Sequence, residues 1–514
     1  MKDHYHPPLR SDALAPAWLL ACLKLALHLS INLWGGYGIF RDELYYLACA
    51  DHPAWGYVDQ PPLSIFLLWV SRAILGDSLF ALRLLPAMAG AALVLATGLL
   101  ARELGGGRWA VALAALASLV AGHNLAVSSI WSMNAFDSLL VASALLLLAR
   151  LLRTGRAWYW IPLGATLGLA LLNKVGTLWI GLGVLVGVLA SRERRWLRTA
   201  WPWAAGVLAA LLALPYLLWN AGHDWAHLEF IESAVAGKYS GLSPWTFLKA
   251  LPFNQNPVTL PLWLAGLGWL LFSRRGRAFR PLALVWLTAF FVLLANGQSR
   301  AGYLAPAFAV LVAAGGVAWE SLGRRHRGIP LALSILLLSG LLLAPFATPM
   351  LPVETFIRYS RALGASPGTD EGLELAELPQ FYADMFGWRE KAEAVAEVFA
   401  ALPPEDRKRA VAFGENYGRA GAIDYFRREM DLPPAIGNHN SYWWWGPGNA
   451  GPDAVVIVLG GQREDLERRF SSVERAATAF CAYCLPYEKD LPVYVARGLA
   501  VPLEELWPLL RHYD

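Results

Sequence analysis

Long apolar runs are the feature of this chain that most limits what it can fold into. About eleven segments, the first from Ala15 to Trp34, approach the roughly 20 apolar residues that cross a bilayer. The chain has 514 residues, of which 56% are hydrophobic and only 16% are charged, and its mean hydropathy is +0.41. A soluble protein does not need so much apolar surface. We therefore expect a polytopic α-helical membrane protein with a water-soluble remainder.

Composition and cysteine spacing give no sign of a nucleic-acid-binding protein or of a zinc site. A net charge of +4 over 514 residues gives no indication of nucleic-acid binding. Cys481 and Cys484, in the sequence CAYC, lack the second cysteine pair or the histidines of a zinc site. A local disulfide or two free thiols is therefore favoured over a redox site. No metal and no cofactor is predicted. The first apolar run has no cleavage site after it, so we expect it to remain as an anchor.

Basic residues form discrete clusters, and such clusters lie on the cytoplasmic side of membrane proteins. If every cluster lies inside, the number of spans between successive clusters must be even, and the apolar runs satisfy this condition. The clusters are Lys2 with Arg10, Arg102 with Arg108, Arg150 with Arg153 and Arg156, SRERRWLR from Ser191, SRRGRAFR from Ser273, and GRRHRG from Gly323. The predicted spans are 15–34, 82–101, 109–123, 135–150, 158–172, 175–190, 200–219, 259–272, 281–296, 301–319 and 329–348.

This topology places the N-terminus in the cytoplasm and the chain after Pro352 outside. The unusual polar residues then all fall on the outer face. They are the acidic stretch after the first span, Trp131 to Asp137, Asn173 with Lys174, the loop 220–258, and NGQSRAGY from Asn296.

Two segments on this face each allow two structures. The apolar segment from Pro61 contains Arg72, which favours a helix along the outer interface over a crossing helix. The loop 220–258 is too long for a simple connector, so we expect either a mobile lid or an ordered interfacial helix.

The chain divides into a transmembrane domain, residues 1–352, and an extracytoplasmic domain, residues 353–514. The second part is charged and contains AVAFGENYGRAGAIDYFRREM followed by DAVVIVLGG. This order of strand, glycine-containing loop, helix and strand predicts an α/β domain.

The first outer loop, residues 35–62, contains the densest group of acids, with Asp42 and Glu43 at its centre. A hydrated loop that orients the span is one interpretation of this pair. Carboxylates near a bilayer interface also mark functional sites, and here they are flanked by aromatic residues and by the stiff sequence YVDQPP. A carboxylate can accept a proton from an acceptor hydroxyl, while a cation stabilises a departing phosphate. Candidate cations are Lys174, Arg300 and Lys238, although Lys174 and Arg300 can equally be snorkelling residues at helix ends.

The motifs RDELYYLA, GYVDQPPL, LRLLPAMAG, WSMNAFDSLL and LLNKVG together resemble the bacterial branch of the dolichyl-phosphate-mannose protein mannosyltransferase family. This group of polyprenyl-phosphate-sugar-dependent enzymes includes the aminoarabinose transferases of lipid A. The resemblance implies a glycosyltransferase of the type C fold, with Asp42 as the catalytic carboxylate and Glu43 beside it. It also implies donor or phosphate binding by a set of residues on the outer face. They are Tyr57, Asp59, Gln60, Asp137, Lys174, Arg300 and Tyr303.

Gln60 departs from the family pattern, because aminoarabinose transferases have a phosphate-binding lysine at this position. The departure argues against an aminoarabinose donor and leaves the phosphate to Lys174 or Arg300. The resulting hypothesis is an enzyme of the cytoplasmic membrane that transfers a sugar from a polyprenyl phosphate, such as undecaprenyl phosphate, to an envelope acceptor. A protein, lipid A, a cell-wall polymer or a glycolipid can be that acceptor. A transporter or flippase, or a sensor with an outer ligand-binding domain, also fits the spans, but no inverted repeat is visible.

Overall fold

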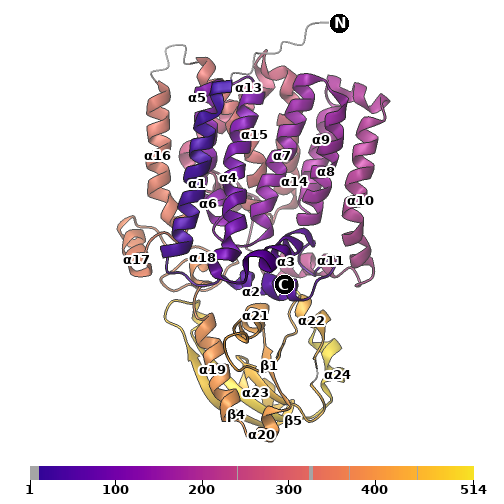
Figure 1. Ribbon diagram of the computed structural model, residues 1–514, viewed down its shortest axis with the longest axis vertical. Coiled ribbons are helices and arrows are strands. Elements are labelled where there is room, and N and C mark those ends of the chain that lie inside the picture. Colours follow the sequence, from indigo (N-terminus) through magenta and orange to yellow (C-terminus); the bar gives the residue numbers. More distant parts are fainter. Residues whose placement is uncertain (1–10, 240, 323–327, 370, 449) are drawn as a thin grey trace.

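The computed structural model describes residues 11–239, 241–322, 328–369, 371–448 and 450–514. A bundle of apolar helices forms one end of the molecule, and a mixed sheet flanked by helices forms the other (Figure 1). The predicted basic clusters at Lys2 with Arg10 and at 323–327 lie outside the described residues.

Within the described residues, seven segments are long and apolar enough to cross a membrane. They are Ala15–Trp34 (α1), Leu79–Glu103 (α4), Met133–Thr154 (α7), Trp201–Ala221 (α10), Gly276–Asn296, which contains α14 (Arg280–Asn296), Ala305–Leu322, which contains α15 (Phe308–Leu322), and Gly328–Ala347 (α16). Shorter apolar helices complete the bundle: α5 (Arg108–Val120), α8 (Trp160–Asn173), α9 (Thr177–Leu189) and α13 (Leu260–Phe272). A helix therefore lies at each predicted span, and the chain is a polytopic helical membrane protein.

Close contacts between backbones hold the bundle together where two helices cross. A Cβ added at Gly266 of α13 would lie 2.0 Å from the carbonyl oxygen of Leu311, and one at Gly315 of α15 would lie 2.1 Å from that of Leu262. Only glycine permits this approach, as is usual in helix packing inside membranes.

Two short helices close the end of the bundle next to the sheet. They are α2 (Arg41–Asp51) and α3 (Leu63–Leu75), joined by a loop that contains Asp59. With 13 residues, α3 spans only about 20 Å. It lies at the bundle end rather than within it (Figure 1), as the interpretation of an interfacial helix predicts. Arg72, near its C-terminus, pairs with Asp51 at 2.9 Å and with Asp77 at 2.5 Å.

The segment 220–258 contains two helices, α11 (Ala226–Ala236) and α12 (Pro244–Asn254). This agrees with the alternative of an ordered helical segment. Closure of the segment over a donor stays a prediction.

The C-terminal part contains a five-stranded mixed sheet in the order β2-β1-β3-β5-β4. The strands β2, β1 and β3 are parallel, and β5 is antiparallel to both β3 and β4. The predicted strand, helix and strand correspond to β1, α21 and β3. The strands are β1 (Ala410–Gly414), β2 (Ala435–Ile436), β3 (Val455–Leu459), β4 (Phe470–Phe480) and β5 (Asp490–Leu499). The helices are α17 (Val353–Ala362), α18 (Gln380–Ala383), α19 (Trp388–Ala401), α20 (Pro404–Arg407), α21 (Tyr417–Phe426), α22 (Ser441–Trp445), α23 (Arg463–Glu467) and α24 (Leu503–Leu506).

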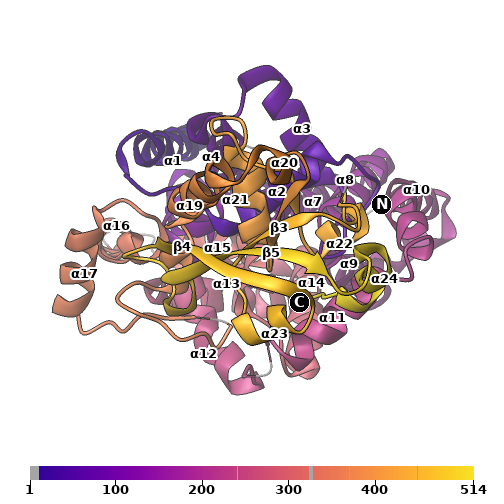
Figure 2. The same cartoon turned by 90° about the horizontal axis from the view of Figure 1, so that it is seen from below.

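The helix α2 is one of the elements that join the two parts. Seen from below, it lies beside α21, with α19 next to them (Figure 2). Two glycines of α21 make this contact close. A Cβ added at Gly418 would lie 2.7 Å from Cγ of Arg41, and one at Gly421 would lie 3.0 Å from Cβ of Leu44. One buried apolar cluster continues from α2 through α21 to the sheet, so the position of α2 depends on both parts of the chain.

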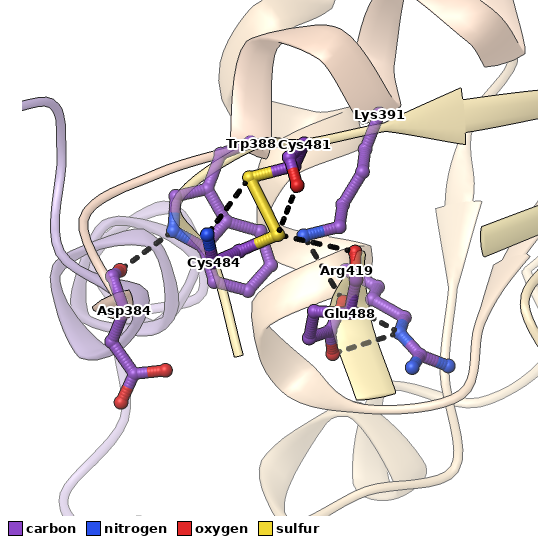
Figure 3. The surroundings of a disulfide bond; sticks show 7 residues. All are labelled: Asp384, Trp388, Lys391, Arg419, Cys481, Cys484 and Glu488. Atoms are coloured by element: carbon purple, nitrogen blue, oxygen red, sulfur yellow. Dashed lines mark hydrogen bonds and ion pairs between the residues drawn. A yellow bond between two sulfur atoms is a disulfide. The ribbon is translucent and has the colours of Figure 1, made fainter. Parts of the chain in front are cut away.

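Cys481 and Cys484 form a disulfide, which confirms the local-disulfide alternative. Beside it, a buried ion network links α19 to α21 (Figure 3). Glu488 Oε2 forms an ion pair with Lys391 Nζ at 3.0 Å, and Oε1 accepts a hydrogen bond from Arg419 Nε at 3.1 Å. The nearby Trp388 donates through Nε1 to the carbonyl oxygen of Asp384 at 2.8 Å, which ties this network to the loop that faces α2.

Candidate active site at the end of the helix bundle

The adjacent acids of α2 point in different directions. Glu43 is fully buried and is saturated by donors. Its Oε1 accepts from the Trp131 backbone N–H at 2.7 Å and from Arg83 Nε at 3.0 Å. Its Oε2 accepts from the Phe40 backbone N–H at 2.9 Å and from Arg83 Nη2 at 2.7 Å. Glu43 therefore fixes the start of α2, and its side chain has no exposed surface.

Asp42 is the accessible member of the pair. Its side chain is 39% exposed, and Oδ1 lies 3.6 Å from Arg41 Nε. The same oxygen accepts a hydrogen bond from the Tyr417 hydroxyl at 2.9 Å. Tyr417 begins α21, so a residue of the C-terminal part orients the candidate catalytic carboxylate.

Arg41 is surrounded by acids. Its Nη2 lies 3.5 Å from Glu371 Oε2 and 3.8 Å from Asp384 Oδ2, and its guanidinium stands 5.6 Å from the centre of the Tyr417 ring. Burial raises the pKa of Asp384 to about 7, although Arg41 opposes that change. Burial also acts to raise the pKa of Glu371, but Lys238 and Arg41 outweigh it and lower this pKa to about 2. Arg41 is therefore held by an ionised glutamate and by a second, weaker acid.

Asp59, in the loop between α2 and α3, is bound to the Tyr45 side chain of α2. Its Oδ1 accepts from the Tyr45 hydroxyl at 2.8 Å, and that hydroxyl lies 2.7 Å from Ser441 Oγ. Burial raises the pKa of Asp59 to about 6, against the lowering effect of the hydrogen bond from Tyr45. Asp42 acts electrostatically to raise the pKa of Asp59, and Lys238 acts to lower it.

Tyr57 and Gln60 lie in the loop that carries Asp59, and both side chains are buried. The Tyr57 hydroxyl donates to the carbonyl oxygens of Cys49 and His52, at 3.1 and 3.2 Å. The Gln60 side chain is buried, and among the described residues its amide has no hydrogen-bond partner. Both side chains lie inside the protein rather than on the open side of the site.

Three cations, Lys174, Arg300 and Lys238, form what we call the cationic wall of the site. Lys174 is held by polar side chains of α7. Its Nζ donates to Asn134 Oδ1 at 2.6 Å and lies 3.8 Å from Asp137 Oδ2. The same ammonium stands 5.1 Å from the centre of the Tyr303 ring. Tyr303 is 40% exposed, so it forms part of the accessible surface beside the lysine.

Arg300 and Lys238 continue this wall toward the acids. Arg300 Nη1 donates to the Tyr239 hydroxyl at 3.4 Å, and Lys238 Nζ lies 3.4 Å from Glu371 Oε1. Arg300 also acts electrostatically on Glu371. The cations and the carboxylates are thus two adjoining parts of one region.

The structure brings most of the predicted residues together. Asp42 is linked to Lys238 through Arg41 and Glu371, and Lys174 stands against Tyr303 and Asp137. Glu43, Tyr57 and Gln60 are buried. Sequence reasoning missed several members of the site: Arg41, Tyr45, Arg83, Glu371, Asp384 and Tyr417. Two signals were available, since Arg41 directly precedes the acid pair and Tyr417 belongs to the motif GENYG.

Comparisons with known proteins show the same fold. ArnT from Cupriavidus metallidurans in the apo state aligns with a TM-score of 0.61 and 14% sequence identity, over 93% of this chain and 97% of that one. The ArnT structure bound to undecaprenyl phosphate aligns with a TM-score of 0.59 and 13% identity over the same shares. No curated protein sequence matches significantly.

The sequence of one segment carries the family signal. Residues 59–219 match the model of the dolichyl-phosphate-mannose-protein mannosyltransferase family. The match begins at Asp59 and includes Asp137 and Lys174. Over this segment, the chain is therefore similar in sequence to the dolichyl-phosphate-mannose-protein mannosyltransferases.

Proposed function

We propose that the chain is a membrane glycosyltransferase that takes a sugar from a polyprenyl phosphate, such as undecaprenyl phosphate, and transfers it to an envelope acceptor. The observation that carries this proposal is the position of Asp42. It is a half-exposed carboxylate at the end of an apolar helix bundle, within the same site as a wall of cations. The ArnT structure with undecaprenyl phosphate, which shares the fold, supports a lipid-phosphate donor.

The donor's lipid tail would lie along the apolar bundle, with its phosphate near Lys174 and Arg300. Cations at this position stabilise the charge that develops on a departing phosphate. Tyr303 lies beside Lys174 and presents an aromatic face to the same place. Because this family position holds Gln60 rather than a lysine, and Gln60 is buried, we assign no contact with the phosphate to it.

For an acceptor with a hydroxyl group, Asp42 is the general base. A bond forms between the acceptor oxygen and the anomeric carbon while the bond from that carbon to the phosphate oxygen breaks. The acceptor proton passes to Asp42, and the electron pair leaves with the polyprenyl phosphate. Tyr417 and Arg41 hold the Asp42 carboxylate in place, and Glu43 fixes the helix that carries it. If the acceptor is itself a phosphate, Asp42 instead stabilises the positive charge on the sugar.

The same geometry favours an extracytoplasmic site. Successive helices cross the bundle in alternate directions, so the basic residues at 102–108, 150–156, 192–198 and 274–280 fall at the end opposite α2. Because basic clusters lie in the cytoplasm, Asp42 and the sheet face the outside of the cytoplasmic membrane. In this arrangement the sheet domain covers the site.

The test is discharge of a radiolabelled polyprenyl-phosphate sugar by the purified protein in vesicles supplied with envelope extract. A transferase moves label from the donor into an acceptor and leaves free polyprenyl phosphate. A flippase moves the intact donor across the bilayer without discharging it, and a sensor does neither. Mass spectrometry of the labelled product, and of envelope glycans from a deletion strain, distinguishes protein, lipid A, cell-wall polymer and glycolipid acceptors.

A further inference from the structure

Two segments far apart in the sequence are joined next to the candidate active site. The Asn440 backbone N–H donates to the carbonyl oxygen of His512 at 2.9 Å, and the His512 N–H donates to that of Asn438 at 3.2 Å. His439 and His512 therefore pair in parallel register. The Asn440 side chain adds a further link, since its Oδ1 accepts from the Asp514 N–H at 3.3 Å.

This pairing gathers two imidazoles and a carboxylate. Nε2 of His439 lies 2.6 Å from Asp514 Oδ1, and Nε2 of His512 lies 3.4 Å from Asp514 Oδ2. One ligand atom from each residue lies within 4.8 Å of the others. His439 is 6% exposed, and neither of its ring nitrogens makes a hydrogen bond of good geometry within the described residues.

The backbone beside His439 is also strained. Asn440 has a φ of +51°, a region that non-glycine residues seldom occupy. The buried Nε2 of His439 and the Asp514 carboxylate oxygen face each other at 2.6 Å, and both are atom types that bind a divalent transition metal.

We propose that His439, His512 and Asp514 form a binding site for a divalent transition metal of the zinc class. Two imidazole nitrogens and one carboxylate oxygen are ligands that such a metal binds at about 2.0–2.2 Å. Tetrahedral ligand atoms at such distances lie about 3.4 Å from one another, so metal binding requires the His439 and Asp514 atoms to separate from their 2.6 Å contact and the exposed His512 side chain to move inward. Three protein ligands leave a fourth position for water or another oxygen ligand. The sequence alone does not indicate a metal here, because the histidines lie far apart along the chain and only the fold joins them.

The metal would position the active site. Ser441, two residues after His439, lies 2.7 Å from the Tyr45 hydroxyl that donates to Asp59. The His439 ring centre lies 4.8 Å from that of Tyr417, whose hydroxyl holds Asp42. A metal that joins the two segments would therefore fix the partners of both carboxylates. The binding proposal itself does not rest on the proposed transferase function.

Metal content tests the proposal directly. The full chain, purified with a tag that contains no histidine, is equilibrated with micromolar zinc, passed through gel filtration and analysed by plasma mass spectrometry. We expect about one zinc ion per chain and a higher melting temperature with zinc than without. His512→Gln and Asp514→Asn should lower zinc retention by about tenfold or more, whereas the control His223→Gln should retain zinc like the parent.

His512 is the most informative position, because its side chain is 54% exposed and its replacement leaves the buried core unchanged. The metal-free His512→Gln protein should melt at the temperature of the metal-free parent, which separates lost binding from misfolding. A parent that retains no zinc, or variants that retain as much as the parent, would overturn the site. A parent protein that retains zinc but discharges no polyprenyl-phosphate sugar would instead count against the proposed transferase function alone.

Discussion

Replacement of Glu43 by glutamine tests whether this acid supports the fold or takes part in the reaction. The parent carboxylate is fully buried, and four donor contacts from Arg83, Phe40 and Trp131 converge on it. Glutamine keeps the shape but has a single acceptor oxygen. Its amide N–H groups would face other donors, and the Arg83 guanidinium would lose its counter-charge.

Removal of one partner from a buried ion pair costs about 3–5 kcal/mol. For a cooperative unit of 514 residues, the unfolding entropy amounts to about 1 kcal/mol per kelvin. Glu43→Gln should therefore lower the melting temperature by about 3–5 °C. Donor discharge per folded molecule should fall much less than in Asp42→Asn, because Glu43 does not reach the open side of the site.

The assay is intrinsic tryptophan fluorescence during heating in detergent, followed by donor discharge at a temperature below both transitions. In the double variant Glu43→Gln with Arg83→Met, the uncompensated buried charge is absent, so part of the lost stability should return. A Glu43→Gln protein that melts like the parent but loses discharge about 100-fold would refute a supporting role, because a loss of that size is typical of a group acting in the reaction.

Three further outcomes are expected. If the reaction needs an ionised Asp59, discharge should rise as the pH increases through about 6, the pKa of this buried acid; Tyr45→Phe removes a hydrogen bond that lowers this pKa and should shift the pH–rate profile to higher pH. Gly421→Val should loosen the contact between α21 and α2, because a Cβ there lies 3.0 Å from a side chain of α2; limited proteolysis should then release the sheet domain faster, while Gly206→Ala, whose Cβ meets nothing within 4 Å, should behave like the parent. Glu464→Cys, on an exposed turn of α23, should react with a membrane-impermeant thiol reagent in intact spheroplasts, and protection there would reverse the assigned topology.

Much of the bundle was predictable. A span in the bilayer must satisfy its backbone hydrogen bonds within the segment, so a continuous apolar run of sufficient length forms a helix. Each such run in this sequence became a helix. The order of β1, α21 and β3 was also predictable, since Val455–Leu459 is wholly apolar and a glycine-containing loop precedes the helix. These features depend on residues close together in the chain.

The division of roles between Asp42 and Glu43 could not be read from the sequence in the same way. Adjacent residues of a helix point about 100° apart, so one can face solvent while the other faces the core. Which one does so depends on Arg83 and on the contact with α21. Tyr417 lies 375 positions from Asp42 in the chain, and no local pattern indicates that the two meet. The same limit hid His439 and His512.

Asp42→Asn tests the central claim most directly, with Asp77→Asn as its matched control. Asp77 has a side-chain exposure of 34%, close to the 39% of Asp42, and it is likewise paired with an arginine. Discharge of radiolabelled polyprenyl-phosphate sugar is measured for both variants and the parent, each shown to fold by its melting transition. We predict that Asp42→Asn loses about 100-fold or more of the turnover, as expected for a general base, while Asp77→Asn keeps nearly all of it. A folded Asp42→Asn protein that discharges the donor at the parent's rate would show that the catalytic centre lies elsewhere.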